Sequence, residues 1–164
     1  MNPPNVMRLD LKLNSKAIIA FGILILLPNL LSLVNIPTPL GPKLHLFQLG
    51  IFIAALVFGP TGGAMSGLVG SIYPALAISN PFIILGNALL GFFFGLFTRM
   101  KFSVVLSVVL AYAIQLAWLI PSDFYLANLP AEFIRSLIVA LLLSNIIWAI
   151  IAAYAARPIR EFLK

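Results

Sequence analysis

Residues 58–75 read FGPTGGAMSGLVGSIYPA and place five glycines in a chain that is otherwise rich in Leu, Ile, Ala, Val and Phe. A glycine-rich segment beside a helix can hold a phosphate group with its backbone N–H groups. Such a loop ends in Gly-Lys-Ser or Gly-Lys-Thr, whereas here Ala64 follows Gly63 and no lysine is near. The segment does not predict a nucleotide site, and the surroundings of the helix must explain its glycines.

The composition of the whole chain defines those surroundings. The 164 residues are 62% hydrophobic and 9% charged, with a mean hydropathy of +1.13, whereas a soluble domain has about 25% charged residues. We predict a multi-pass integral protein of the cell membrane, with residues 1–164 forming a single domain. Basic residues precede the first apolar run, but no small-residue cleavage site follows, so this run is expected to be a retained helix.

Breaks at polar residues, proline and glycine divide the chain into apolar segments. They predict a compact all-α bundle of six transmembrane helices, at roughly 17–34, 44–58, 62–78, 81–97, 102–120 and 130–154. The second and fourth segments are short for a membrane crossing, so a re-entrant arrangement was the alternative.

The distribution of charge favours six crossings. If all six segments cross, one side holds eight of the ten basic residues, namely Arg8, Lys12, Lys16, Arg99, Lys101, Arg157, Arg160 and Lys164. Lys43 and Arg135 then lie on the other side. Because basic residues concentrate on the cytoplasmic side, both termini are expected to be cytoplasmic. The net charge of +6 thus reflects topology and does not indicate nucleic-acid binding.

Small residues recur at helical spacing in the third segment. They form two ridges, Gly63-Gly67-Ser71 and Gly62-Ser66-Gly70. Helices in lipid associate through close backbone contact at small residues, so these ridges predict helix packing, and one of them is a candidate face for a partner subunit. Gly59-Pro60-Thr61 predicts a tight cytoplasmic turn before this helix.

Polar residues inside the spans gather in the outer half of the expected bundle. Four helices each contribute one: Gln48, Asn87, Gln115 and Arg135. Asn80 with Pro81 predicts a capped start of the fourth helix, with its positive dipole end facing outward. The pattern predicts an outward-facing cavity with hydrogen-bonding groups and one cation, Arg135.

Two alternatives stay open for these residues. Gln48, Asn87 and Gln115 could bond one another as interhelical contacts, and Arg135 could pair with Glu132 one turn earlier. Trp118 and Tyr125 lie near the same depth, as membrane-interface residues or as cavity wall.

Catalysis has little support in the sequence. The outer acids are Asp123 and Glu132, nine residues apart, and His45 has neither a second histidine nor a cysteine to complete a metal site. We predict no enzyme activity, no metal and no cofactor. An acid in mid-span, which ion-coupled carriers usually need, is missing too.

Two stretches carry a resemblance to a known family. Residues 36–76, IPTPLGPKLHLFQLGIFIAALVFGPTGGAMSGLVGSIYPAL, and residues 80–97, NPFIILGNALLGFFFGLF, resemble the S component of energy-coupling factor (ECF) transporters, the small membrane subunits that bind vitamins. The resemblance spans roughly residues 17–154. It implies six helices with both termini inside and a substrate held in the outer half, under a lid formed by the loop after the first helix.

The resemblance also implies partners. S components work with a transmembrane coupling subunit and two ATPase subunits, which drive a toppling motion of the S component in the membrane. The coupling subunit meets an Ala-xxx-Ala motif of the first helix, but here Ala17 and Ala20 are three apart, so the third helix could share the partner face. The metal-specific members carry a histidine near the N-terminus, which this chain lacks.

Two functions therefore compete. The favoured one is a substrate-binding subunit for a small vitamin-like molecule, working with a coupling subunit, two ATPases and membrane lipids. The alternative is a membrane scaffold of the rod-shape-protein type. A scaffold has no need of polar groups that converge at one depth, whereas a binding protein does.

Overall fold

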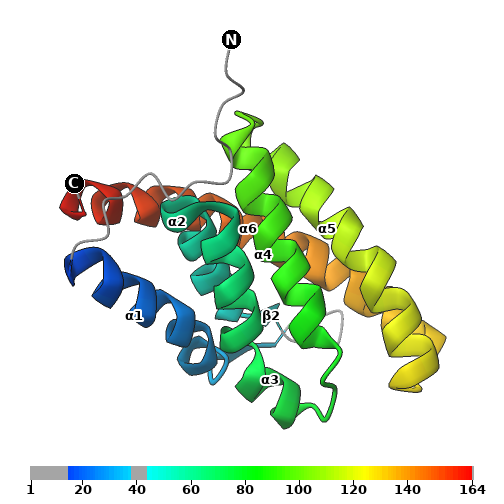
Figure 1. Cartoon of the computed structure of the whole chain (residues 1–164). Coiled ribbons are helices and arrows are strands. Elements are labelled where there is room, and N and C mark those ends of the chain that lie inside the picture. Colours follow the sequence, from blue (N-terminus) through cyan, green and yellow to red (C-terminus); the bar gives the residue numbers. More distant parts are fainter. Residues whose placement is uncertain (1–14, 38–43, 164) are drawn as a thin grey trace.

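The computed structural model describes residues 15–37 and 44–163 and is almost entirely helical (Figure 1). A two-residue antiparallel ladder joins the strands β1 (Asn35–Ile36) and β2 (Leu44–His45). The helices are α1 (Ser15–Leu31), α2 (Phe47–Gly70), α3 (Ile72–Ala77), α4 (Ile83–Arg99), α5 (Val104–Pro121), the π-helical turn η1 (Ser122–Leu126) and α6 (Ala131–Phe162).

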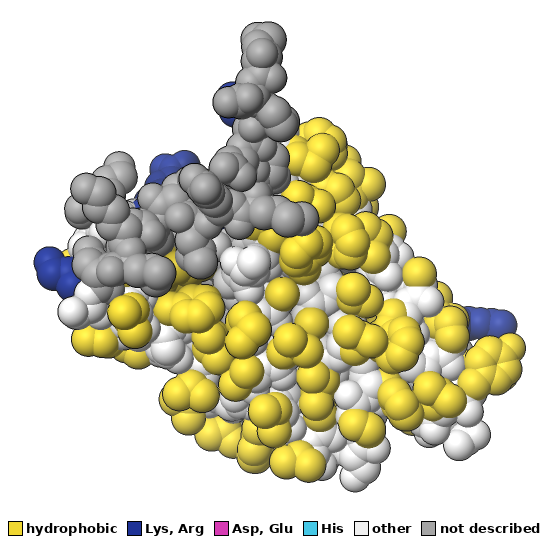
Figure 2. All heavy atoms as spheres, viewed as in Figure 1, with side chains coloured by type: hydrophobic (Ala, Val, Ile, Leu, Met, Phe, Trp, Pro, Cys, Tyr) yellow, Lys and Arg dark blue, Asp and Glu magenta, His cyan; other side chains and the backbone are white. Residues whose placement is uncertain are grey.

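The exterior of the bundle is apolar. Exposed aliphatic side chains cover the outer faces of the helices, such as Ile19 on α1 and Leu106 on α5, and Figure 2 shows apolar side chains spread over the face seen in Figure 1. Within the described residues, three helical segments are long and apolar enough to cross a membrane: Phe47–Ala77, Val104–Leu126 and Ala131–Phe162. Helices α1 and α4 are shorter and also apolar. This surface is suited to lipid.

The chain reverses its direction inside α2. Gly59 has φ 77° and ψ −161°, which is not helical, and a side chain rarely adopts such a positive φ. A Cβ atom at Gly63 would lie 2.8 Å from the Cβ of Ala55, eight residues away, although residues eight apart in a continuous helix are about 12 Å apart. Residues 47–58 and 60–70 therefore run side by side as two arms of α2, with the turn at the place that Gly59-Pro60-Thr61 predicts.

Both small-residue ridges of the second arm are used within the chain. Gly63 and Gly67 face α4, where an added Cβ would collide with the backbone of Gly91 and of Asn87. On the other ridge, the Ser66 hydroxyl donates to the Leu24 carbonyl at 2.8 Å.

Gly70 completes this second ridge, because an added Cβ there would lie 2.6 Å from Pro28 of α1. Gly63, Gly67 and Gly70 thus lie at two interfaces between helices of one chain, the first two at α4 and the third at α1. Ala17 is also buried, while Ala20 is half-buried.

One end of the bundle gathers basic side chains. Arg160 donates through Nε (2.8 Å) and through a terminal nitrogen to the Leu56 carbonyl, and Arg99 donates to the Phe58 carbonyl at 3.5 Å. Both carbonyls belong to the last turn before Gly59, where helical C=O groups lack backbone partners. Lys16 lies over the ring of Phe162 at the same end, 5.0 Å from its centroid. We call the end that holds Lys16, Arg99 and Arg160 the basic end.

Several boundaries differ from those that the sequence predicts. The segment predicted as one helix over 62–78 breaks at Ser71 into α2 and α3, and the last helix continues to Phe162 instead of ending at 154. Residues 121–129, predicted as a loop, begin with η1. The basic residues Arg8, Lys12, Lys43 and Lys164 lie outside the described residues.

The contact between α2 and α4 generates a prediction about stability. Gly67→Ala should destabilise the bundle by about 1–3 kcal/mol or more, because its methyl group would overlap backbone atoms that cannot rotate away. Thermal unfolding in detergent measures the effect. The matched control is Gly22→Ala on α1, where an added Cβ has no neighbour within 4 Å, so its melting temperature should stay unchanged or rise slightly. Equal melting temperatures for the two variants would contradict the assigned contact.

Candidate ligand-binding cavity

A cavity of about 610 Å³ lies at the end of the bundle opposite the basic end. Its volume falls within the range of about 300–1,000 Å³ that small-molecule sites occupy. Its wall residues come from the end of α1, from β2, from both ends of the α2–α3 segment, and from the helices α4, α5 and α6. They are Ser32, Leu33, His45, Phe47, Gln48, Tyr73, Pro74, Ala77, Ile78, Asn80, Ile83, Asn87, Gln115, Leu119, Asp123, Leu129, Phe133, Leu137 and Leu141.

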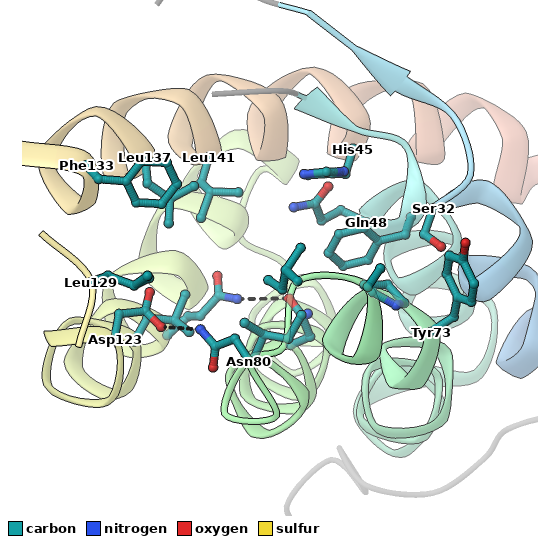
Figure 3. Close-up of a pocket in the computed structure, with 18 of the residues that line it drawn as sticks. Ser32, His45, Gln48, Tyr73, Asn80, Asp123, Leu129, Phe133, Leu137 and Leu141 are labelled. Atoms are coloured by element: carbon teal, nitrogen blue, oxygen red, sulfur yellow. Dashed lines mark hydrogen bonds between the residues drawn. The ribbon is translucent and has the colours of Figure 1, made fainter. Parts of the chain in front are cut away.

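The wall has an apolar side and a polar side. Phe133, Leu137 and Leu141 follow one face of α6 and lie across the cavity from Asn80 and Asp123 (Figure 3). A site with a large apolar surface and a few fixed polar groups is typical of ligand cavities, because the apolar surface provides affinity and the polar groups provide orientation.

A hydrogen-bonded chain of side chains crosses the polar side. Gln115 of α5 donates through Nε2 to Asn87 Oδ1 of α4 at 3.1 Å, and Asn87 donates through Nδ2 to the Ser71 hydroxyl at 2.9 Å. All three side chains are buried, with exposures of 3%, 3% and 0%. Buried polar groups need such partners, since an unpaired one costs about 1–3 kcal/mol. Asn87 and Gln115 therefore serve both as an interhelical contact and as cavity wall.

A second polar pair lies beside this chain. Asn80 donates through Nδ2 to Asp123 Oδ1 at 2.8 Å, and both side chains are buried (Figure 3). Asn80 Oδ1 accepts the backbone N–H of Phe82 at 3.1 Å, which is an Asx turn before α4. The prediction that Asn80 caps α4 is wrong, because the N-cap residue is Phe82 and no side chain caps it. Asn80 instead forms a turn three residues before Ile83, and its amide nitrogen holds Asp123.

Two buried oxygen atoms of the wall are unpaired within the described residues. Gln48 Oε1 and Gln115 Oε1 are buried and have no hydrogen-bond partner within residues 15–37 and 44–163. Because they can only accept, they suit a ligand that donates hydrogen bonds. In the part of the chain that the structure describes, His, Asp and Glu side chains form no group that could hold a metal ion.

The structure brings together four of the seven side chains that the sequence predicts at the cavity. Gln48, Asn80, Asn87 and Gln115 line it. The other three, Trp118, Tyr125 and Arg135, are not among the wall residues in the described part of the chain.

Trp118 donates through Nε1 to the Phe82 carbonyl at 2.9 Å and packs against α4. Tyr125 is 73% exposed, with its ring edge-on to Phe124.

The expected place of Arg135 at cavity depth is corrected. Its side chain is exposed, and the helical periodicity explains why. Phe133, Leu137 and Leu141 are four residues apart and share the cavity face of α6. Arg135 follows Phe133 by two residues, about 200° around the helix, so it faces away.

Asp123 lines the cavity although the sequence does not predict it as a site residue. A loop was expected at 121–129, but α5 continues through Pro121 into η1, so Gln115, Leu119 and Asp123 follow one helix face at intervals of four. That spacing was the signal that could have found it. His45 also lines the cavity.

A helical bundle with an apolar exterior and a partly polar cavity at one end is typical of membrane proteins that bind a small molecule. Comparison with known proteins gives the class. The sequence matches the family described as ECF-type riboflavin transporter, S component, over residues 12–164. The chain therefore belongs to this family of S components, which are transporter subunits and not enzymes.

The fold agrees with this membership. The structure aligns with that of the S component of a bacterial ECF transporter with a TM-score of 0.61 and 20% sequence identity, covering 91% of this chain and 98% of that one. No curated protein sequence matches the chain. The resemblance noted in the sequence is thus confirmed, and the scaffold alternative is not favoured.

The hydrogen bonds that join Gln115, Asn87 and Ser71 generate a second prediction about stability. Asn87→Leu should lower stability by about 1–3 kcal/mol, because it leaves Gln115 Nε2 and the Ser71 hydroxyl without their partner. The matched control is Asn145→Leu on α6. Asn145 is 1% exposed, and neither amide atom has a partner among the described residues, so no hydrogen bond is lost there. In thermal unfolding in detergent, the melting temperature of Asn87→Leu should be well below that of Asn145→Leu. The reverse order would contradict the assigned bonds.

Proposed function

We propose that this chain is the substrate-binding subunit of an ECF-type riboflavin transporter and that riboflavin occupies the cavity. The observation that carries the proposal is the cavity itself, about 610 Å³ in volume, in a chain of this family. In this proposal a transmembrane coupling subunit and two ATPase subunits complete the transporter.

The chemistry of the cavity wall supports riboflavin. Riboflavin joins a flat, largely apolar ring system to a chain of hydroxyl groups, and the ring also carries an imide N–H. The ring suits the side formed by Phe133, Leu137 and Leu141. The hydroxyl and imide groups can donate to the unpaired oxygens of Gln48 and Gln115 and to the Asp123 carboxyl group.

The arrangement of charge supports an outward-facing cavity. Lys16, Arg99 and Arg160 lie at the end of the bundle away from it. Since basic residues concentrate on the cytoplasmic side, we propose that both termini are cytoplasmic, that the chain crosses the plasma membrane six times, and that the cavity opens outside. The two arms of α2 count as two of these crossings.

We propose the outer face of α1 as the surface that meets the coupling subunit. Ile19, Ile23 and Leu30 are each about 60% exposed on this face. Ala17 is 1% exposed, so the contact would be made by these larger aliphatic side chains and not through close backbone approach at Ala17.

Riboflavin binding tests the proposed site. Asp123→Asn keeps the shape of the side chain but replaces an accepting oxygen by a donor, so it should weaken riboflavin binding about 10- to 150-fold, the equivalent of a charge-assisted hydrogen bond of about 1.5–3 kcal/mol. Quenching of flavin fluorescence on titration into purified protein measures the affinity.

Arg135→Met is the control, because Arg135 is outside the cavity wall. Its affinity should stay within about threefold of the wild-type value, whereas a ligand contact of Arg135, as the sequence suggests, would produce the large loss in this variant instead. Wild-type protein that neither retains flavin on purification nor quenches its fluorescence would overturn the proposed function.

The proposed orientation can be tested with single cysteines, since the chain contains none. An impermeant maleimide added to intact cells should label Tyr125→Cys, near the cavity end, and should label Lys101→Cys, next to Arg99, only after the cells are permeabilised. Labelling in the opposite pattern would show that the cavity faces the cytoplasm.

A further inference from the structure

The junction between α2 and α3 is held open by a side chain of α1. In a continuous helix the Val69 carbonyl would accept the N–H of Tyr73, four residues on. Instead, Asn29 Nδ2 donates to the Val69 carbonyl at 2.9 Å, and the Tyr73 N–H donates to Asn29 Oδ1 at 2.9 Å. One amide group thus stands between the two partners of a helical hydrogen bond and satisfies both, a known cause of helix breaks.

The same junction is tied to the cavity from the other side. Ser71, the residue between α2 and α3, accepts from Asn87, which in turn accepts from Gln115. Both Asn87 and Gln115 line the cavity, whereas Ser71 and Asn29 do not occur among its wall residues. The hydrogen bonds therefore lead from the wall at α5 to the junction and on to α1.

The position of α3 depends on whether the junction is broken. Tyr73, Pro74, Ala77 and Ile78 of the α3 segment line the cavity. Closing the junction into a continuous helix would redirect α3 and displace this part of the wall. It would also release Asn29, so the cavity wall and α1 would change together.

The second arm of α2 is suited to transmit such a change. At Gly67 it contacts the backbone of α4 directly, and at Gly70 it contacts the Pro28 ring of α1. Such close packing leaves little room for one helix to move independently of the others. Helices α1 and α5 lie on opposite sides of the bundle (Figure 1), so a direct contact does not account for an effect of one on the other.

We propose that the α2–α3 junction couples occupancy of the cavity to the position of α1. The Ser71 hydroxyl connects the junction to the cavity wall, and the Asn29 amide connects it to α1. A ligand that donates to the unpaired Gln115 oxygen orders the Gln115 amide, and thereby Asn87 and Ser71. The broken form of the junction, with Asn29 inserted, is stabilised as a result. This inference rests on the proposed function in one respect, that the ligand occupying the cavity is riboflavin.

Hydrogen exchange in ligand-free protein tests the connection itself. Gln115→Leu removes the donor to Asn87, so the amides of residues 72–76 and 26–31, apart from Pro74 and Pro28, should exchange at least about fivefold faster than in the wild type. Tyr112→Phe is the control, because it removes another buried hydrogen bond of α5, the one to the Ile138 carbonyl of α6 at 2.7 Å. It should change the exchange of these amides less than about twofold.

Hydrogen exchange with riboflavin tests the coupling to occupancy. Saturating riboflavin should slow exchange of the same amides at least about fivefold in the wild type. Ser71→Ala should reduce this slowing below about twofold, with riboflavin affinity changed less than about threefold. Ser66→Ala is the matched control, because Ser66 of α2 also has 0% exposure and its hydroxyl bonds to α1 outside the connection. This variant should keep the full slowing.

The outcomes separate the inference from the proposed function. If Gln115→Leu alters exchange only in α4 and α5, or if Ser66→Ala and Ser71→Ala reduce the slowing equally, the coupling is overturned. Wild-type protein that does not bind riboflavin overturns the proposed ligand alone. The ligand-free comparison of Gln115→Leu with Tyr112→Phe then still decides whether the cavity wall is connected to α1. Should Ser71→Ala fail to fold, Ser71→Thr, which retains the hydroxyl group, should preserve the slowing, and its loss would overturn the inference.

Discussion

The contact on which the rest of the structure depends is the approach of two backbones, those of the second arm of α2 and of α4. Gly63 and Gly91 face each other so closely that a side chain on either would meet the carbonyl group of the other. In lipid, where apolar side chains gain little from leaving the solvent, such close packing is a main source of attraction between helices. The short distance also lets Asn87 reach Ser71. The packing glycines and the polar cavity wall are therefore parts of one arrangement.

The reversal at Gly59 divides the molecule into two ends with different chemistry. At the reversal, Arg99 and Arg160 donate to carbonyl groups that the end of the first arm leaves unpaired. At the other end of the arms, Gln48 and the residues after Ser71 border the cavity. Because each arm is only about 11 or 12 residues long, these two ends are separated by roughly 17 Å of helix. The guanidinium groups thus stabilise the turn from which both arms extend toward the cavity.

Two kinds of polar side chain bear on the cavity. Asn29, Asn87 and Ser66 each bond to a neighbouring helix, and they hold the positions of α1, α2 and α4. Gln48 and Gln115 keep one unpaired oxygen each within the described residues, and both line the cavity. An unpaired buried oxygen is costly for stability unless a partner occupies the site. The two oxygens are therefore where a hydrogen-bond donor of a ligand would gain the most.

The sequence by itself determined that this is a helical membrane protein, where its apolar helices lie along the chain, that it turns at Gly59, and that it resembles the S components. It also singled out Gln48, Asn87 and Gln115, because polar groups within apolar spans are conspicuous in any register, and Asn80 as the expected start of a helix. Tertiary structure alone decided which faces these helices turn to one another. It placed Arg135 outside the cavity, since two residues along a helix reverse the direction of a side chain. It brought Asp123 inside, since α5 continues past a proline that suggested a loop. The insertion of Asn29 between Val69 and Tyr73 joins residues 40 and 44 positions apart, and no local pattern of the sequence encodes such a contact.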